Sequence, residues 1–179
     1  MKKQGKKAVL LREPGGVKIS EKIRSIILDP LNRRMDPLAE LLLYEAARAQ
    51  LVKEKIAPLL NKGYTVILDR FYLATTVYQG YGRGIDRALI QRLNSEAAKG
   101  IKNIFFVVYD VPQDEAAKRM RTRRSKDRIE SAGRAFHAKI RNGYIKEAGK
   151  MKNSILIKTG GKSAGQVFEE TVKALGSRI

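Results

Sequence analysis

Four short apolar runs, separated by longer stretches of helical character, most constrain what this chain can fold into. The runs are Ala8–Leu11, Thr65–Leu68, Ile104–Tyr109 and Ile155–Ile157. Runs this short that are rich in β-branched and aromatic residues are typical of strands buried in a parallel sheet. Their alternation with helices predicts an α/β fold with helices on both faces of the sheet. No repeat or linker interrupts the 179 residues, so we expect one domain over residues 1–179.

The segments between these runs carry helix signals. Asp36 suits the N-cap of a long helix over Asp36–Leu60, and Pro37 suits its first position, where a missing N–H is harmless. Gly63 is the expected stop. Further helices are expected over Asp86–Lys99, Gln113–Arg124 and Ser163–Leu175, the last with a capping box of Ser163 and Gln166.

The charge balance raises the question of a polyanionic partner. The chain has 37 Lys and Arg against 18 Asp and Glu, a formal net charge of +19. Such a surface attracts polyanions and phosphorylated ligands, although a lysine-rich solvated surface has the same composition. A nucleic-acid partner is not expected, because no aromatic-studded sheet pattern, helix-turn-helix pattern or zinc spacing accompanies the charge.

The missing residue types and patterns exclude other classes. The sequence has no cysteine, which excludes disulfides, thiolate metal sites and cysteine nucleophiles. No apolar run approaches the ~20 residues that a membrane span requires, so no membrane partner is expected. The N-terminal residues lack the pattern of a signal peptide, and a cytoplasmic location is the expectation.

The chemistry of the chain is concentrated where the second apolar run ends. Asp69 and Arg70 follow that run, at the sheet edge where open parallel sheets bind ligands. An arginine there can grip a phosphate with two N–H groups, and a carboxylate can hold a Mg²⁺-bound water or orient a phosphate acceptor. A structural ion pair at a strand end is the alternative. The run YQGYGRG over Tyr78–Gly84 begins nine residues after Asp69, and its three glycines predict an irregular segment that lets the backbone approach a ligand.

Taken together, these motifs resemble those of bacterial thymidylate kinases, which are P-loop nucleoside monophosphate kinases. The DRF and YQGYGRG segments carry the resemblance, together with REPGG at Arg12–Gly16 and LLLYEAARAQ at Leu41–Gln50. It implies a three-layer α/β/α fold with a parallel sheet. It also implies a homodimer that phosphorylates dTMP to dTDP in dTTP synthesis, with ATP as donor and Mg²⁺ as cofactor.

The resemblance also implies roles for individual residues. The dTMP-binding set would be Arg12, Glu13, Pro14, Tyr44, Arg48, Arg70, Thr75 and Gln79. Tyr44 and Arg48 are four residues apart and share a helix face, where the family stacks an aromatic ring on thymine and hydrogen-bonds it with an arginine. Without the resemblance, Tyr44 reads as a core residue. Asp69 and Arg70 would act in catalysis, with Asp69 reaching the metal through water.

A basic run forms the third constellation. Seven of the eleven residues from Lys118 to Arg128 are basic, which also fits a solvated helix end. By resemblance, residues 118–130 form a lid whose arginines neutralise charge on the transferring phosphoryl group. The lid arginines are Arg119, Arg123, Arg124 and Arg128, of which Arg124 and Arg128 are the catalytic candidates. The only histidine, His137, is expected to occupy an ordinary helix position without a catalytic role.

The family's phosphate-donor motif does not occur in the printed sequence. No G-x-x-x-x-G-K-[ST] is present, and TGGKS at Thr159–Ser163 fails because Leu156 stands where the first glycine is required. We expect the first, central strand of the sheet to be missing together with that loop. The 179 residues alone are then expected to be inactive or nearly so. A truncated start and a natural dTMP-binding relative without catalysis both remain open, as does a basic polyanion-binding module.

Overall fold

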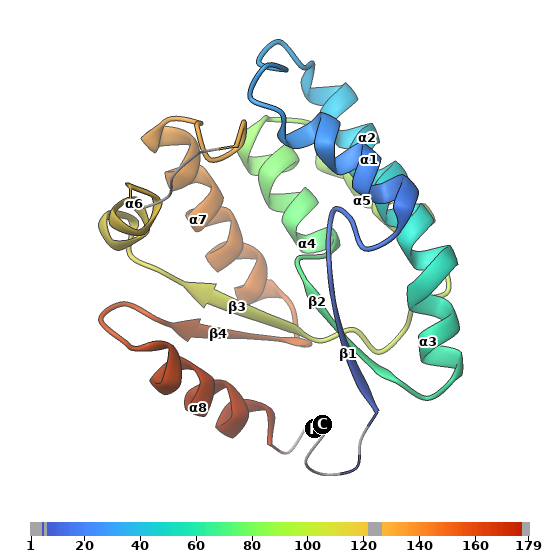
Figure 1. Ribbon diagram of the computed structural model, residues 1–179. Coiled ribbons are helices and arrows are strands. Elements are labelled where there is room, and N and C mark those ends of the chain that lie inside the picture. The colour runs from blue at the N-terminus through green and yellow to red at the C-terminus, as the bar shows by residue number, and fades with distance from the viewer. Residues whose placement is uncertain (1–4, 6, 122–126, 177–179) are drawn as a thin grey trace. The chain divides into compact units, whose positions relative to one another are not determined.

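The computed structural model describes residues 5, 7–121 and 127–176 and shows an α/β arrangement with parallel strands (Figure 1). The element order is β1 (Ala8–Arg12), α1 (Lys18–Leu28), α2 (Pro37–Leu51), η2 (Val52–Ile56), α3 (Ala57–Asn61), β2 (Thr65–Asp69), α4 (Tyr72–Thr75), η3 (Thr76–Gly82), α5 (Arg87–Ala97), β3 (Phe106–Asp110), α6 (Gln113–Arg121), α7 (Arg134–Lys150), β4 (Ser154–Lys158) and α8 (Ala164–Leu175). The four predicted strands are confirmed, with bounds that differ by at most two residues.

The chain divides into two compact units. Unit 1 comprises residues 1–102 and 127–129, and unit 2 comprises residues 103–126 and 130–179. The described strands form two separate two-stranded parallel sheets, β1 with β2 and β3 with β4. The α/β expectation with parallel strands is therefore confirmed. The single domain, the continuous three-layer sheet and the missing central strand stay predictions.

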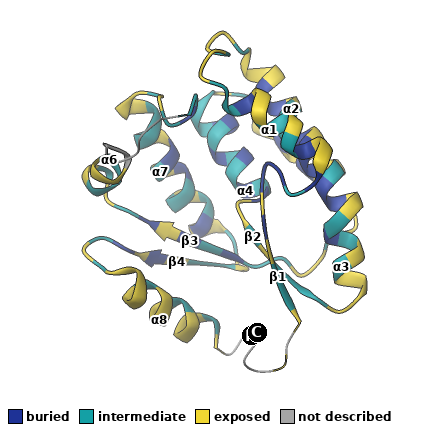
Figure 2. Cartoon of the chain, viewed as in Figure 1, coloured by how far each residue is buried: buried dark blue, intermediate teal, exposed yellow. Residues whose placement is uncertain are grey.

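Unit 1 is built around helix α2. Strands β1 and β2 pair in register from Ala8 opposite Thr65 to Arg12 opposite Asp69. Helix α1 packs on α2, where the buried Ser20 hydroxyl donates a hydrogen bond to the Ala47 carbonyl at 2.7 Å. Figure 2 shows buried residues on α1, α2 and α4. The most buried apolar side chains of this unit are Ile27, Leu41, Leu51, Ile56, Val77 and Ile90.

The described part of unit 2 contains the second sheet and three helices, α6, α7 and α8. Helix α7 packs on β3 and β4, and α8 packs on β4. Arg141 of α7 forms a two-bond ion pair with Asp110 at the end of β3, with distances of 2.6 and 3.0 Å. The predicted capping box is confirmed, because the Ser163 hydroxyl accepts from the Gln166 backbone while the Gln166 side chain accepts from the Ser163 backbone.

The long helix predicted over residues 36–60 is confirmed at its start and differs in its interior. Asp36 is the N-cap and accepts hydrogen bonds from the backbone N–H groups of Leu38 and Ala39. The helix is interrupted by the π-helical turn η2 before it resumes as α3, one residue ahead of Pro58. A proline cannot donate to the helical hydrogen-bond ladder, so the wide turn stands where that ladder is broken.

The irregular segment predicted at the three glycines of residues 78–84 is wrong. Residues Thr76–Gly82 form the π-helix η3, which continues α4. Gly80 serves packing, because a Cβ there would lie 3.3 Å from Ile90 and 3.6 Å from Arg87 of α5. Only Gly84 has the predicted turn character, with φ of 80°.

Candidate functional site

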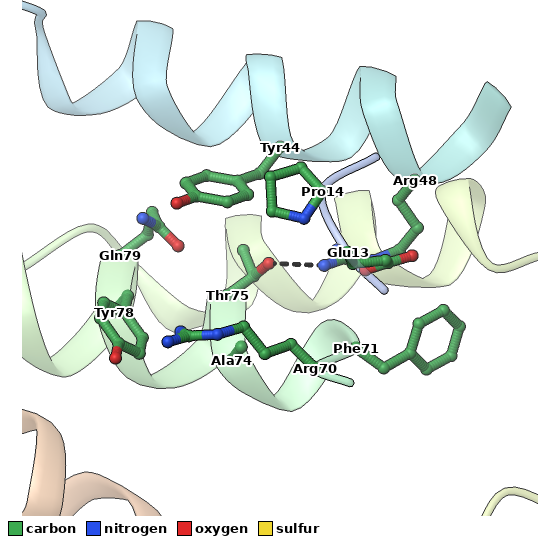
Figure 3. Close-up of a pocket in the computed structure, with 10 residues that line it drawn as sticks. All are labelled: Glu13, Pro14, Tyr44, Arg48, Arg70, Phe71, Ala74, Thr75, Tyr78 and Gln79. Carbon is green, nitrogen blue, oxygen red and sulfur yellow. Dashed lines mark hydrogen bonds and ion pairs between the residues drawn. The ribbon is translucent and has the colours of Figure 1, made fainter. Parts of the chain in front are cut away.

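A pocket in unit 1 brings together residues from five segments of the chain (Figure 3). Its lining residues are Glu13 and Pro14 after β1, Tyr44 and Arg48 of α2, Arg70 and Phe71 after β2, Ala74 and Thr75 of α4, and Tyr78 and Gln79 of η3. About 270 Å³ of empty space lies within it, including open solvent at its mouth. Seven of the eight predicted dTMP-binding residues line this pocket.

Arg12 is the predicted binding residue that does not line the pocket. Its guanidinium is exposed and pairs with Glu21 of α1 at 3.1 Å. Glu21 also accepts from the Gly16 backbone N–H at 2.7 Å.

Gly16 has φ of 87°, and a Cβ there would lie 2.9 Å from Leu51. The second glycine of the pair is therefore required by the left-handed backbone and by close packing on α2.

Arg70 stands at the open edge of the pocket. Its backbone is left-handed, with φ of 69°, which is uncommon for a residue other than glycine. Its guanidinium carbon lies 5.1 Å from the centre of the Tyr78 ring, and Figure 3 shows the side chain extending toward Tyr78. Strained backbone at a strand end that also bears a cation is typical of ligand sites. This geometry presents a positive charge beside an aromatic wall.

Asp69 lies outside the pocket lining. Its side chain is exposed at the end of β2, and its carbonyl accepts a hydrogen bond from the Glu13 backbone N–H at 2.9 Å. Among the residues that the structure describes, no group of three or more His, Asp or Glu side chains could hold a metal ion. Mg²⁺ is commonly held by one or two carboxylates together with substrate phosphates, and Asp69 is the carboxylate that the sequence places for that role.

The floor of the pocket is a buried ion cluster around Arg48. Its guanidinium is 2% exposed and donates from Nε to Glu13 at 2.9 Å and from Nη1 to Glu45 at 2.6 Å. Nη1 also donates to Asn94 of α5 at 2.9 Å, and Nη2 donates to Thr75 at 2.8 Å. Arg48 therefore fixes four side chains, two of which line the pocket, Glu13 and Thr75.

Two carboxylates share this single guanidinium. Burial raises the pKa of Glu13 to about 7, and the positive charge of Arg48 only partly opposes the effect. Burial also raises the pKa of Glu45. The charges of Glu13 and Glu45 raise the pKa of Arg48 against the effect of its own burial, so the guanidinium keeps its charge. The Oε1 atom of Glu13 is buried without a hydrogen-bond partner among the described residues, as a protonated carboxyl group would allow.

Tyr44 and Gln79 border the pocket from opposite helices (Figure 3). Burial, followed by the nearby charge of Glu40, raises the pKa of Tyr44 to about 12, so its hydroxyl stays protonated. Gln79 is 1% exposed, and its Nε2 donates to Glu40 at 2.7 Å. The aromatic ring of Tyr44 and the amide of Gln79 thus both line the pocket.

The basic segment is only partly described. Arg119 of α6 pairs with Glu115, one helical turn away. Arg123 and Arg124 lie outside the described residues. Arg128 is 7% exposed and pairs with Glu40 at 2.5 Å, and it does not line the pocket. His137 lies on α7 with its ring edge-on to Phe136, in an ordinary helix position as predicted.

Several residues of this region were not among the predicted site residues. Phe71, Tyr78 and Arg83 lie in the motifs that carry the resemblance but had no role of their own, and Ala74, Glu40 and Asn94 were not assigned to the site. For Glu40 a local signal exists, because it precedes Tyr44 by one helical turn. Asn94 has none, since it meets Arg48 from 46 positions away.

Comparison with known proteins gives one consistent result. A family model described as Thymidylate kinase matches residues 1–171. A thymidylate kinase of Geotalea daltonii is 42% identical over 98% of this chain and 86% of its own length. Thymidylate kinases of Caldanaerobacter subterraneus and Enterococcus faecalis are 39% and 41% identical, over 98% and 99% of this chain and 83% and 84% of their own lengths.

Proposed function

Because the chain belongs to the thymidylate kinase family, we propose that its pocket binds dTMP as the acceptor of a phosphoryl group donated by ATP, giving dTDP. One observation carries the proposal. The lining of one pocket joins the aromatic rings of Tyr44 and Tyr78, the buried polar groups of Arg48 and Thr75 and the exposed guanidinium of Arg70. These are the groups that a base and a phosphate require.

The base is assigned to the inner part of the pocket. Tyr44 supplies an aromatic plane for stacking, an interaction worth ~1–3 kcal/mol per base in single-strand complexes. Arg48 supplies the positive floor and holds Thr75 at 2.8 Å, so that both meet the base edge. Glu13 and Pro14 close the wall from the loop after β1.

Gln79 is the group that separates thymine from cytosine. The pKa of Glu40 is lowered, as described below, so its carboxylate is ionised and can only accept. The amide nitrogen of Gln79 must therefore face Glu40, at 2.7 Å, and the amide oxygen lies on the other side. That oxygen accepts a hydrogen bond from the N3–H group of thymine. N3 of cytosine is itself an acceptor, so cytosine would place two acceptors against each other and binds less well.

The phosphate is assigned to Arg70, which is exposed beside Tyr78. Its planar guanidinium can bind two phosphate oxygens at once. Asp69, the preceding residue, would hold Mg²⁺ through water. The ion, when bound, supplies positive charge that offsets the charge developing on the phosphates. Asp69 itself orients that water or the acceptor oxygen, and Arg70 holds the acceptor phosphate in line.

The remaining parts of the proposal rest on the family. Arg119, Arg123, Arg124 and Arg128 belong to the proposed lid, and a cytoplasmic homodimer is the proposed assembly. Leu38 and Leu42 support the dimer, since both are nearly half exposed one turn apart on α2. Within the described residues, no helix has the length and apolar character to cross a membrane.

The test is calorimetric titration of the 179-residue chain with dTMP, dCMP and dGMP. We expect dTMP to bind most tightly, because stacking and the Gln79 oxygen act together only for thymine. Tyr44→Leu keeps the apolar volume and removes the plane, and it should weaken dTMP binding by ~1–3 kcal/mol. Equal affinity for all three monophosphates would contradict the proposal.

A further inference from the structure

The carboxylate of Glu40 connects three parts of unit 1 that are far apart in sequence. It is 1% exposed, in the first turn of α2. Oε1 accepts from Gln79 at 2.7 Å. Arg83 contacts both oxygens, at 3.1 and 3.0 Å, and the Arg128 guanidinium lies 2.5 Å from Oε2. A buried carboxylate held by two arginines and one amide has well-compensated charge and a fixed orientation.

Two opposing effects set the ionisation of Glu40. Burial raises the pKa of its carboxyl group, but the hydrogen bonds from Arg83 and Gln79 and the charges of Arg83 and Arg128 outweigh it. The pKa therefore lies below its ordinary value. The carboxyl group stays ionised and can only accept hydrogen bonds. It therefore holds the amide nitrogen of Gln79 and cannot hold the amide oxygen.

Toward the pocket, Glu40 acts through Gln79 alone. Gln79 lines the pocket and Glu40 does not. An amide side chain can rotate to exchange its donor and acceptor ends unless a partner prevents it. The Glu40 carboxylate is that partner, so the pattern that Gln79 offers to a ligand depends on a residue outside the pocket lining.

On its other side, Glu40 holds the end of the basic segment. Residues 127–129 belong to unit 1, although the residues on either side of them belong to unit 2. Arg128 donates from its backbone N–H to the Leu28 carbonyl at 3.1 Å and from Nε to the Ile27 carbonyl at 2.8 Å. The carbonyls are those of the last turn of α1, which has no basic residue of its own. Arg128 thus complements a helix C-terminus while it neutralises Glu40.

We propose that Glu40 is a positioning residue that sets the base preference of the pocket through Gln79 and couples occupation of the pocket to the docking of Arg128. This inference rests on the proposed function, because it assigns the base to Gln79. A ligand that pulls on the Gln79 oxygen steadies the amide, which steadies Glu40 and its pair with Arg128. Coupling between two sites is reciprocal. The factor by which a bound ligand favours the Glu40–Arg128 contact is therefore also the factor by which loss of that contact weakens ligand binding.

A purely structural ion pair would behave differently. It would lower stability when broken, and it would leave the preference between two pyrimidine monophosphates unchanged. The ratio of two affinities, measured on the same folded protein, therefore separates a positioning role from a structural one.

The first experiment titrates the full chain with dTMP and dCMP. Glu40→Gln keeps the shape but lets either end of a new amide face Gln79, so the dTMP-to-dCMP affinity ratio should fall about tenfold, the equivalent of one hydrogen bond. Glu54→Gln is the matched control, because Glu54 also accepts from a glutamine amide, that of Gln50 at 2.8 Å, on an exposed helix surface. The control should keep the ratio. A Glu40→Gln protein with an unchanged ratio would overturn the proposal.

The second experiment tests the coupling and does not depend on Glu40→Gln being folded. Arg128→Met removes a group that does not line the pocket, and it should weaken dTMP binding about tenfold. Combined with Glu40→Gln, it should add little more. Unchanged dTMP affinity in a folded Arg128→Met protein, checked by circular dichroism, would overturn the coupling. Failure of the unaltered chain to bind dTMP would instead overturn the proposed function, and this inference with it.

Discussion

The pH dependence of stability tests the buried pair of Glu13 and Arg48. Burial raises the pKa of Glu13 in the folded protein to about 7, from an ordinary value of 4.5 that the unfolded chain should show. The folded state then holds a proton that the unfolded state has already released between these pH values. The stabilisation that this provides is complete below pH 4.5 and is lost as the pH rises through 7.

The magnitude follows from the difference between the two pKa values. At about 1.4 kcal/mol for each pH unit, the free energy of unfolding should fall by about 3 kcal/mol in all. Most of that loss lies between pH 5 and pH 8. It is a large part of the 5–15 kcal/mol that is typical of a whole domain, so it is measurable.

The assay is urea unfolding followed by circular dichroism, at intervals from pH 5 to pH 8, for the unaltered chain and for Glu13→Gln. The glutamine keeps the shape and cannot titrate, so other groups contribute equally to both proteins. We expect the unaltered chain to lose most of that ~3 kcal/mol relative to the variant across this range. Parallel pH curves would refute the reasoning, because they would mean that Glu13 is ionised throughout and that Arg48 fully offsets its burial.

Four further outcomes are expected. Arg70→Lys keeps the charge and loses the planar fork, so calorimetry should show weaker binding of dTMP and nearly unchanged binding of thymidine; equal losses would make Arg70 structural. Arg48→Met leaves Glu13 and Glu45 buried without a cation, and urea unfolding should show a loss of ~3–5 kcal/mol, in contrast to the few tenths expected if the cluster were solvated. The N-cap of α1 is Val17, whose side chain makes no capping hydrogen bond. Val17→Thr should therefore raise the free energy of unfolding by ~1 kcal/mol. No gain in urea unfolding would mean that the hydroxyl fails to reach the helix N–H groups. The 179 residues alone should release no ADP above background in a coupled assay with dTMP, ATP and Mg²⁺, because the printed sequence lacks G-x-x-x-x-G-K-[ST]; robust dTMP-dependent turnover would show that other residues hold the donor phosphates.

Features set by neighbouring residues were predictable from the sequence. The strand positions followed from the apolar runs, and the caps at Asp36 and Ser163 followed from side chains that bond within one helical turn. The family resemblance named seven residues that the structure brings together in one pocket, Tyr44 and Gln79 among them, and their roles there stay predictions. For the strands and the caps, the signal and the structure lie within a few residues of one another.

Features set by distant partners were not predictable. The segment with three glycines forms a π-helix in which Gly80 packs closely against Ile90 of α5, a contact that no local pattern indicates. Arg48 is bonded to Asn94, which is 46 positions away, and the family resemblance presented Arg48 only as a base-reading arginine. The pairing of Glu40 with Arg128 joins α2 to the basic run, which its charge assigned to a solvated helix end and the resemblance assigned to a lid.

The Nε bond from Arg128 to the Ile27 carbonyl spans 101 positions, and this separation has a consequence for how the protein is made. Translation runs from the N-terminus, so α1 and α2 are synthesised before Arg128 and must wait for their shared cation. Until then the carboxylate of Glu40 faces its buried site with Arg83 but without Arg128. Contacts of such sequence separation are slow to form, so we expect the end of α1 to be the last part of unit 1 to gain protection from hydrogen exchange during synthesis. Nascent chains halted before and after residue 128 would show that difference directly.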